Sequence, residues 1–280
     1  ADGRARVVNP RNDPDLFWAL KGGGGGTFGV ITRLTLRTHD LPKWFGYAAG
    51  SIRARSDQAF KRLIAHFISF YRDKLFNPHW GEQVKIGPDN SLEISMTSQG
   101  LDDAQTKTVW RAFFDWVSTS PADFIVTSPF WAGARDSRTW WAVEGNPDMT
   151  PDTRAGASGG RAWSRGDQGE VGIFLHGYDS LWLPASLLQA NRQQEFVDAL
   201  FAASRHKLLR LFMNKGLAGA SPEVIAAARE TATNPVLVDA FALVIIADGH
   251  GLAYPGLAPT TAALPAARKD AHAIDLAAAE

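Results

Sequence analysis

Five consecutive glycines at positions 22–26 restrict the fold of this chain more than any other feature. Glycine weakens a helix or a strand because its backbone has the most freedom to lose, so the run predicts a loop. A run of this length in a chain that otherwise has the pattern of a folded protein indicates that something approaches the main chain closely. A phosphate group or a cofactor is the first candidate.

Regular elements are predicted on both sides of this loop. Before it, Asp13 can cap a helix, Pro14 suits the first helical position, and Lys21 and Gly22 suit the helix end. After it, apolar and polar residues alternate over residues 30–38, which predicts a half-buried strand. The expected order is therefore a short helix, a glycine loop and a strand.

The first nine residues resemble a hairpin that is cut short. Asp2 and Gly3 have the chemistry of a two-residue turn, and residues 4–9 would form the second arm, but only Ala1 precedes the turn. We therefore expect the chain to begin inside a domain and to be a fragment of a longer protein. An ordinary frayed terminus is the alternative.

Composition excludes several classes of protein. The 280 residues are 45% hydrophobic without an apolar run that could cross a bilayer, which predicts a soluble globular protein without a membrane partner. Lys plus Arg and Asp plus Glu both number 29, so no global charge favours nucleic acid. Cysteine is absent, and no histidine or acidic spacing suggests a metal site. The sequence does not distinguish a cytoplasmic from a secreted protein, nor one oligomeric state from another.

Three known phosphate-binding motifs match the glycine run only in part. Gly24, Gly26, Phe28, Gly29 and Ile31 match the phosphate-covering loop of protein kinases, but the downstream kinase motifs are missing. In the dinucleotide fingerprint the glycines open a helix after a strand, which is the reverse of the order here. The glycine run is not followed by the Gly-Lys-Ser/Thr that a Walker loop requires. A flexible connector explains the glycines but not the patterned strand that follows.

Residues 15–42, "DLFWALKGGGGGTFGVITRLTLRTHDLP", resemble the flavin-domain signature of the vanillyl-alcohol oxidase superfamily, which has a PCMH-type FAD-binding domain. The resemblance is closest to its bacterial berberine-bridge-enzyme-like oxidases, to which residues 168–184 and 214–220 are also similar. It implies an α+β fold. Residues 1–45 would be the C-terminal portion of the FAD-binding domain, and residues 46–280 a substrate domain with a large antiparallel sheet flanked by helices.

The resemblance also implies that FAD binds to the glycine loop through main-chain groups. A loop without Cβ atoms lets backbone N–H groups reach a pyrophosphate or a flavin edge. The segments that carry a second phosphate loop and a covalent flavin attachment in this family would lie before Ala1, and a terminal tyrosine-asparagine segment is missing. The implied cofactor-binding residues are Gly22, Gly23, Gly24, Gly25, Gly26, Thr27, Phe28, Gly29, Val30 and Ile31, with Phe28 also suited to packing.

Alternating helices and strands are expected after residue 46. Apolar stripes predict core-facing helices over residues 60–71 and 109–117. Residues 83–86 and 92–97 flank the turn "GPDNS" and have the pattern of a hairpin. Further strands are predicted at 169–178, 208–213 and 241–246, and further helices at 184–204 and 222–233.

Candidate catalytic residues are few. On the predicted strand 169–178, strict alternation would put His176 and Tyr178 on one face with Gly177 on the other, so that both could face a flavin. A structural histidine and a half-buried tyrosine are the alternative. Weaker candidates are the polar strand face of Glu93, Ser95 and Thr97, the aromatic pair Trp140 and Trp141 as cavity walls, and Lys215 as an anion-binding group.

The expected function is that of an FAD-dependent oxidoreductase that transfers a hydride from a small organic substrate to flavin N5. Molecular oxygen is a candidate electron acceptor. The alternative is a non-catalytic remnant or binding protein that keeps the fold without flavin. The substrate does not follow from the sequence.

Overall fold

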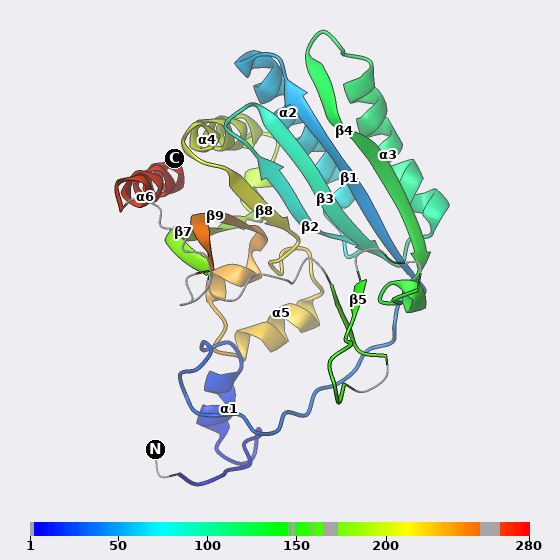
Figure 1. Cartoon of the computed structure of the whole chain (residues 1–280). Helices are drawn as coiled ribbons and strands as arrows, with labels where there is room; N and C mark the ends of the chain where they lie inside the picture. The colour runs from blue at the N-terminus through cyan, green and yellow to red at the C-terminus, as the bar shows by residue number, and fades with distance from the viewer. Residues whose placement is uncertain (1–2, 145, 147–148, 158–159, 165–172, 253–263) are drawn as a thin grey trace.

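A computed structural model describes residues 3–144, 146, 149–157, 160–164, 173–252 and 264–280. Its main element is a seven-stranded sheet, ordered β4-β1-β3-β2-β8-β9-β7, in which neighbouring strands are antiparallel (Figure 1). Its strands are β1 (Trp44–Ala54), β2 (Trp80–Ile86), β3 (Ser91–Gln99), β4 (Phe124–Asp136), β7 (Ile173–Pro184), β8 (Leu209–Met213) and β9 (Ala240–Leu252). A small second sheet pairs β5 (Met149–Pro151) with β6 (Ala162–Ser164).

Helices form a layer on one face of the large sheet (Figure 1). They are α2 (Asp57–Phe70), which a π-helical turn at Tyr71–Leu75 continues, α3 (Asp103–Ser118), α4 (Gln193–His206) and α6 (Leu264–Ala279). The expected α+β fold with a large antiparallel sheet flanked by helices is confirmed.

The hydrophobic core lies between the helices and the sheet. The two predicted apolar stripes both turn inward, and Phe60, Phe67, Trp110 and Phe113 are completely buried. Alternate strand residues such as Ile94 meet these rings from the sheet side. Both core-facing helices are therefore confirmed.

Most predicted strands exist, some with different ends. The hairpin around "GPDNS" is formed by β2 and β3, residues 208–213 correspond to β8, and residues 241–246 lie within β9. The strand predicted at 169–178 is β7 from Ile173 onward, and residues 169–172 lie outside the described part.

The helix predicted over 184–204 is interrupted. A short 3-10 turn, Ala185–Leu188, is followed by extended backbone at Gln189, and α4 begins only at Gln193. The helix predicted over 222–233 is α5 (Pro222–Arg229), which ends earlier.

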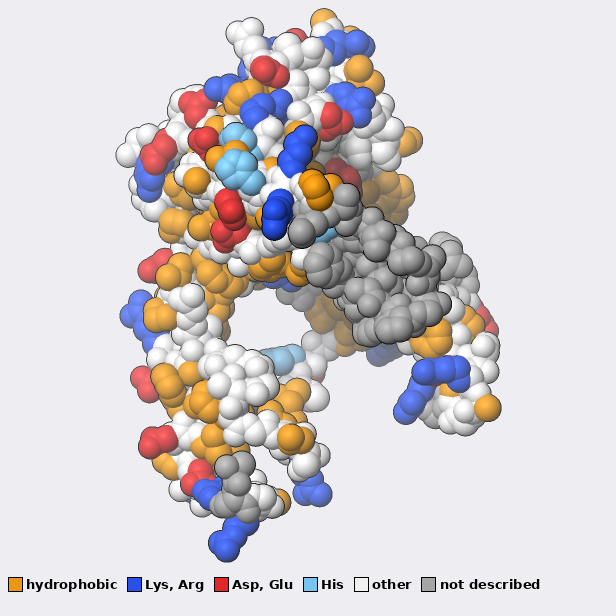
Figure 2. Space-filling model, turned by 60° about the vertical axis from the view of Figure 1, so that its left-hand side comes forward, with side chains coloured by type: hydrophobic (Ala, Val, Ile, Leu, Met, Phe, Trp, Pro, Cys, Tyr) orange, Lys and Arg blue, Asp and Glu red, His pale blue; other side chains and the backbone are white. Residues whose placement is uncertain are grey.

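The N-terminal segment contains the predicted helix α1 (Pro14–Leu20) but not the predicted strand. Residues 30–38 form no strand in the described structure, and Val30, Leu34 and Leu36 are 92%, 67% and 73% exposed. A strand needs a neighbour that accepts and donates its ladder hydrogen bonds, and no described strand lies beside this segment. The strand-like arm expected at residues 4–9 is likewise absent from the described structure. Figure 2 shows the segment at the bottom, with a gap between it and the body that carries the sheet.

Candidate functional site

The sheet has a second face, which points away from the helix layer. Ile94 pairs with Val84 and both are buried under the helices, so their neighbours along each strand point to the opposite side. We call this side the open face. By strand register it carries Phe45, Tyr47, Gln83, Lys85, Glu93, Ser95, Thr97, Gln99, Tyr178, Trp182, Arg210, Phe212, Leu243 and Ile245.

Polar groups on the open face are joined in pairs across the strands. The Tyr47 hydroxyl lies 2.8 Å from Oγ of Ser95, and Nζ of Lys85 lies 2.8 Å from Oε1 of Glu93. Glu93 and Ser95 are thus brought to one face, as their alternation predicts, together with Thr97. The face offers a tyrosine hydroxyl and an ion pair rather than a bare apolar surface.

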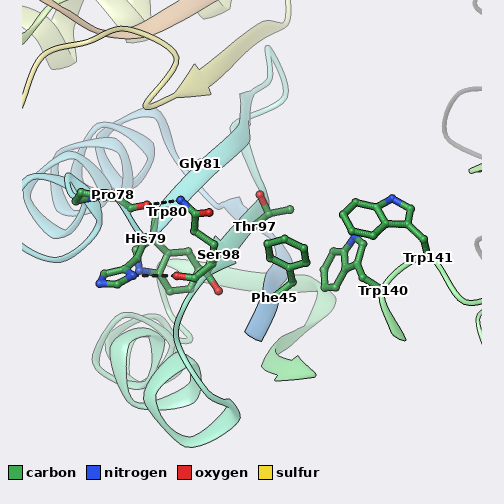
Figure 3. A pocket seen from close by; sticks show the side chains of 10 residues that line it. Phe45, Pro78, His79, Trp80, Gly81, Thr97, Ser98, Trp140 and Trp141 are labelled. Carbon is green, nitrogen blue, oxygen red and sulfur yellow. Dashed lines mark hydrogen bonds between the residues drawn. The ribbon is translucent and has the colours of Figure 1, made fainter. Parts of the chain in front are cut away.

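A pocket of about 290 Å³ opens at one end of this face, where β1 begins and β3 ends (Figure 3). Phe45 lies edge-on to both Trp140 and Trp141, with ring centroids 5.8 and 5.5 Å apart. The two tryptophans named from the sequence therefore do form an aromatic wall. The pocket is lined by Phe45, Pro78, His79, Trp80, Gly81, Thr97, Ser98, Gln99, Trp140 and Trp141.

The glycine loop lies elsewhere, next to the end of α5. The backbone N–H of Ala232 donates to the carbonyl of Lys21 at 3.1 Å, which ties the start of the loop to the segment after α5. Lys21 also reaches the carbonyl of Glu230 at 3.5 Å. Most of the loop is exposed, and none of its residues lines the pocket.

Packing or backbone conformation explains four of the five glycines at positions 22–26. A Cβ on Gly22 or Gly23 would collide with Thr233 or with the carbonyl of Ala19, so packing explains these two. Gly24 and Gly26 have φ of 98° and 71°, which side chains disfavour. Gly25 has neither constraint, because its φ is ordinary and a Cβ there would meet nothing within 4 Å.

The predicted catalytic pair is not brought together. The register of β7 against β9 shifts between Leu175 and Gly177, which marks a bulge at His176. The His176 ring is 1% exposed and bonds to Asp270 of α6 on the helix side. Tyr178 pairs with Ala247, lies on the open face and is 55% exposed. The bulge breaks the strict alternation on which the shared face was predicted.

His176 belongs to a network of charged groups. Asp270 also bonds to Nζ of Lys207 at 3.0 Å, and Lys207 reaches Asp248 at 2.6 Å. Hydrogen bonds from Lys207 and from His176 hold the pKa of the Asp270 carboxyl below its usual range. Burial lowers the pKa of Lys207, but its hydrogen bonds to Asp248 and Asp270 outweigh this and raise it. The network ties β7, β9 and α6 together.

Sequence reasoning missed Phe45, Tyr47 and Gln99 as site residues. Strand β1 reads "WFGYAAGSIRA", and small residues occupy most of its buried positions. The hydropathy contrast that reveals a strand is therefore weak there. The alternation of small with large side chains in this segment was the signal that could have predicted the strand.

The described residues include neither a metal-binding cluster nor a membrane-spanning helix. Among the described residues, no group of three or more His, Asp or Glu side chains is placed to hold a metal ion. None of the helices in the described part is both long and apolar enough to cross a bilayer.

Sequence relatives match parts of the chain, although no protein-family model matches it. FAD-linked oxidoreductase ZEB1 of Gibberella zeae is 34% identical over 130 residues, 45% of this chain and 22% of that protein. FAD-linked oxidoreductase pytB of Aspergillus terreus is 49% identical over 37% of this chain and 14% of that protein. VAO-type flavoprotein oxidase VAO615 of Thermothelomyces thermophilus is 33% identical over 41% of this chain and 20% of that protein. The matches thus span at most 22% of these relatives.

Solved structures match almost the whole chain. VAO-type flavoprotein MtVAO615 of Myceliophthora thermophila C1 superposes with a TM-score of 0.63 and 19% identity, over 99% of this chain and 46% of that one. The chain has the fold of the VAO-type flavoproteins. A carbohydrate oxidase from Microdochium nivale also matches, with a TM-score of 0.54 and 18% identity, over 97% of this chain and 51% of that one. The chain therefore spans about half the length of the structures it matches.

Proposed function

We propose that this chain serves an FAD-dependent oxidase of the berberine-bridge-enzyme-like type, which transfers a hydride from a small organic substrate to flavin N5. The VAO-type fold and the FAD-linked oxidoreductases among the relatives support FAD as the cofactor. Molecular oxygen is the electron acceptor in this proposal.

The observation that carries the proposal is the unexplained glycine at position 25. Packing or backbone conformation accounts for Gly22, Gly23, Gly24 and Gly26, but neither accounts for Gly25. A group that approaches the main chain from outside the described residues would account for it, because a Cβ would block hydrogen bonds to the exposed N–H groups. We assign this role to FAD, held by the main chain of residues 22–31.

The open face is the surface that we assign to the substrate. Tyr178 is exposed there, and its hydroxyl would orient the substrate or pass on its proton. Bound FAD supplies the hydride acceptor. His176 lies on the helix side, so we assign it a positioning role, in which its bond to Asp270 holds the bulged part of β7.

The proposed boundary after residue 45 lies within two residues of the start of the sheet. Strand β1 begins at Trp44, and the residues before it contribute no strand to the described sheet. We therefore propose residues 1–45 as part of the flavin domain and residues 46–280 as the substrate domain.

Absorption spectroscopy of the purified protein in its full natural length tests the proposal. We expect the characteristic visible bands of flavin, and their bleaching when a substrate is added without oxygen. A colourless protein that takes up no added FAD would support the alternative, a remnant or binding protein that keeps the fold without the cofactor. If the protein binds flavin but no organic substrate reduces it, FAD stands as the cofactor and the proposed oxidase activity is refuted.

A further inference from the structure

We propose that the pocket at the end of the open face binds an uncharged aromatic ring that carries one hydrogen-bond donor, such as a phenolic hydroxyl. This site goes beyond the proposed function, because it requires neither FAD nor the candidate Tyr178.

The aromatic wall of the pocket is held in place before any ligand arrives. Arg135 and Asn146 both donate to the carbonyl of Trp140, at 3.1 and 2.8 Å. The Arg135 guanidinium also lies 5.0 Å from the centre of the Trp140 ring. Phe45 meets this ring edge-on. A wall that is already fixed loses little conformational entropy when a ligand binds.

An exposed tryptophan completes the wall. Trp141 is 58% exposed although its ring lies edge-on to Phe45, and Figure 3 shows it beside Trp140 at the rim of the pocket. Exposed aromatic rings that gather at a cavity are typical of ligand sites. A flat ring laid against the exposed part of Trp141, beside Phe45, would cover apolar surface that is now in water.

Polar groups in the pocket can fix the orientation of such a ring. Nε2 of Gln99 donates to the carbonyl of Pro78 at 3.0 Å, which makes Oε1 the acceptor end of this amide. Oε1 of Gln99 and the Thr97 hydroxyl have no hydrogen-bond partner within the part of the chain that the structure describes. Together they suit one donor substituent on the ligand.

The lining excludes a charged ligand. No aspartate, glutamate, lysine or arginine lines the pocket in the described part of the chain, and an ion transferred there without a partner would lose hydration. The titratable residue of the lining is His79. Its Nδ1 lies 2.9 Å from the carbonyl of Gln99, so this nitrogen is the donor.

Size and polarity favour an aromatic ring over a sugar ring. An apolar cavity of about 150 Å³ holds benzene, so about 290 Å³ admits one substituted or fused ring. A sugar ring carries a hydroxyl on most of its carbons, and each one loses water on binding unless it finds a partner. Thr97 and Gln99 would serve too few of them.

The pocket lies apart from Tyr178. It is built on β1, β2 and β3, whereas Tyr178 is on β7, four strands from β3 in the sheet order. At about 4.8 Å per strand, the two places are roughly 20 Å apart. A single ring cannot reach both, so the pocket is a second ligand site on the open face.

Titration with p-cresol, toluene and glucose, followed by calorimetry or ligand-observed NMR, tests the site. We expect p-cresol to bind saturably and about 3- to 10-fold more tightly than toluene, the difference that one hydrogen bond makes. Trp141→Ala should weaken p-cresol binding about tenfold. Gln99→Leu should abolish the preference for p-cresol over toluene while toluene still binds.

A matched control variant distinguishes the loss of this site from a general effect of removing an exposed aromatic ring. Trp18→Ala removes a tryptophan that is 50% exposed on α1, away from the pocket, and should leave p-cresol binding unchanged. Circular dichroism should show that all variants keep the fold, since Trp141 and Gln99 are exposed. Equal binding to wild type and Trp141→Ala, or binding of glucose instead of p-cresol, would overturn the proposal. The result is independent of flavin content, so it does not depend on the proposed oxidase function.

Discussion

Nδ1 of His176 lies 2.8 Å from Oδ2 of Asp270, and this contact joins the bulge of β7 to helix α6. The His176 ring is buried, so water cannot readily replace Asp270 as a partner. Gly177 lies against Ala271 and Ile274 of the same helix, which places two successive residues of β7 on α6. The contact therefore anchors the C-terminal helix to the edge strand.

Asp270→Asn should destabilise this anchor. The change removes the charge that bonds to both His176 and Lys207, and we expect the free energy of unfolding to fall by about 1 to 3 kcal/mol. Urea denaturation at neutral pH measures it. Asp275→Asn changes the same residue type at an exposed position of α6 and should have little effect. Equal losses in the two variants would contradict the anchor.

The stabilisation by Asp270 should vanish in acid. Its pKa is lowered in the folded protein by Lys207 and His176, so the folded state binds the proton less readily than the unfolded chain does. The stabilisation is therefore complete above the unfolded pKa of about 4, and is lost as the pH falls through the lower folded value. The difference in stability between wild type and Asp270→Asn should therefore shrink below about pH 4 and disappear only below the lowered folded pKa of Asp270.

Thr106→Val should stabilise the protein. Oγ1 of Thr106 is buried in α3 without a hydrogen-bond partner among the described residues, and valine has the same shape. We expect a gain of about 1 kcal/mol in a thermal or urea unfolding experiment. Thr108→Val, on the exposed side of α3, is the control, because that hydroxyl donates to the carbonyl of Ala104. A loss of stability in Thr106→Val would reveal a partner for the buried hydroxyl.

Asp102→Ala should weaken the start of α3. The Asp102 side chain accepts from the backbone N–H of Gln105 at 2.8 Å, and Oε1 of Gln105 accepts from the N–H of Asp102 at 2.9 Å. Loss of this capping box should cost about 1 kcal/mol of unfolding free energy. Asp115→Ala, at an exposed position later in α3, should cost nothing measurable.

Gly25→Ala isolates the approach of a ligand to the glycine loop. The described chain has room for the added methyl group, so the melting temperature without FAD should not change. If FAD approaches here, its affinity should fall about tenfold or more in a titration followed by flavin fluorescence. Gly24→Ala serves as a contrast, because its positive φ should make the loop itself less stable. Unchanged FAD affinity in Gly25→Ala would show that FAD does not approach the main chain at position 25.

Local patterns predicted those elements whose partners lie close in the sequence or whose apolar face is broad. The helices around Phe60 and Trp110 and the hairpin of β2 and β3 are of this kind. The alternating residues 30–38 have a strand pattern as clear as that of β3, yet they form no strand in the described structure. The alternation of apolar and polar residues predicts which face a strand would bury. Strand pairing also requires a neighbouring strand, which a local pattern does not reveal.

The candidate site was predicted less well than the fold. The polar face of Glu93, Ser95 and Thr97 follows from simple alternation, whereas the bulge at His176 breaks that alternation. The adjacent Gly177 was the sign of it in the sequence. The pocket joins Phe45 to Trp140 and Trp141 through the pairing of β1 with β4, which is a contact between distant residues. Such contacts depend on the order of strands in the sheet, which the spacing of residues along the sequence does not predict.

The sheet order also has a consequence for synthesis. Strands β1 to β4 pair among themselves, but the outer edge of β2 is covered by β8, whose Met213 pairs with Glu82. A nascent chain that has left the ribosome only as far as β4 therefore presents this edge with its amides and carbonyls open to other chains. Conditions that slow translation between these strands should lower the yield of native protein, with the aggregate growing from that edge.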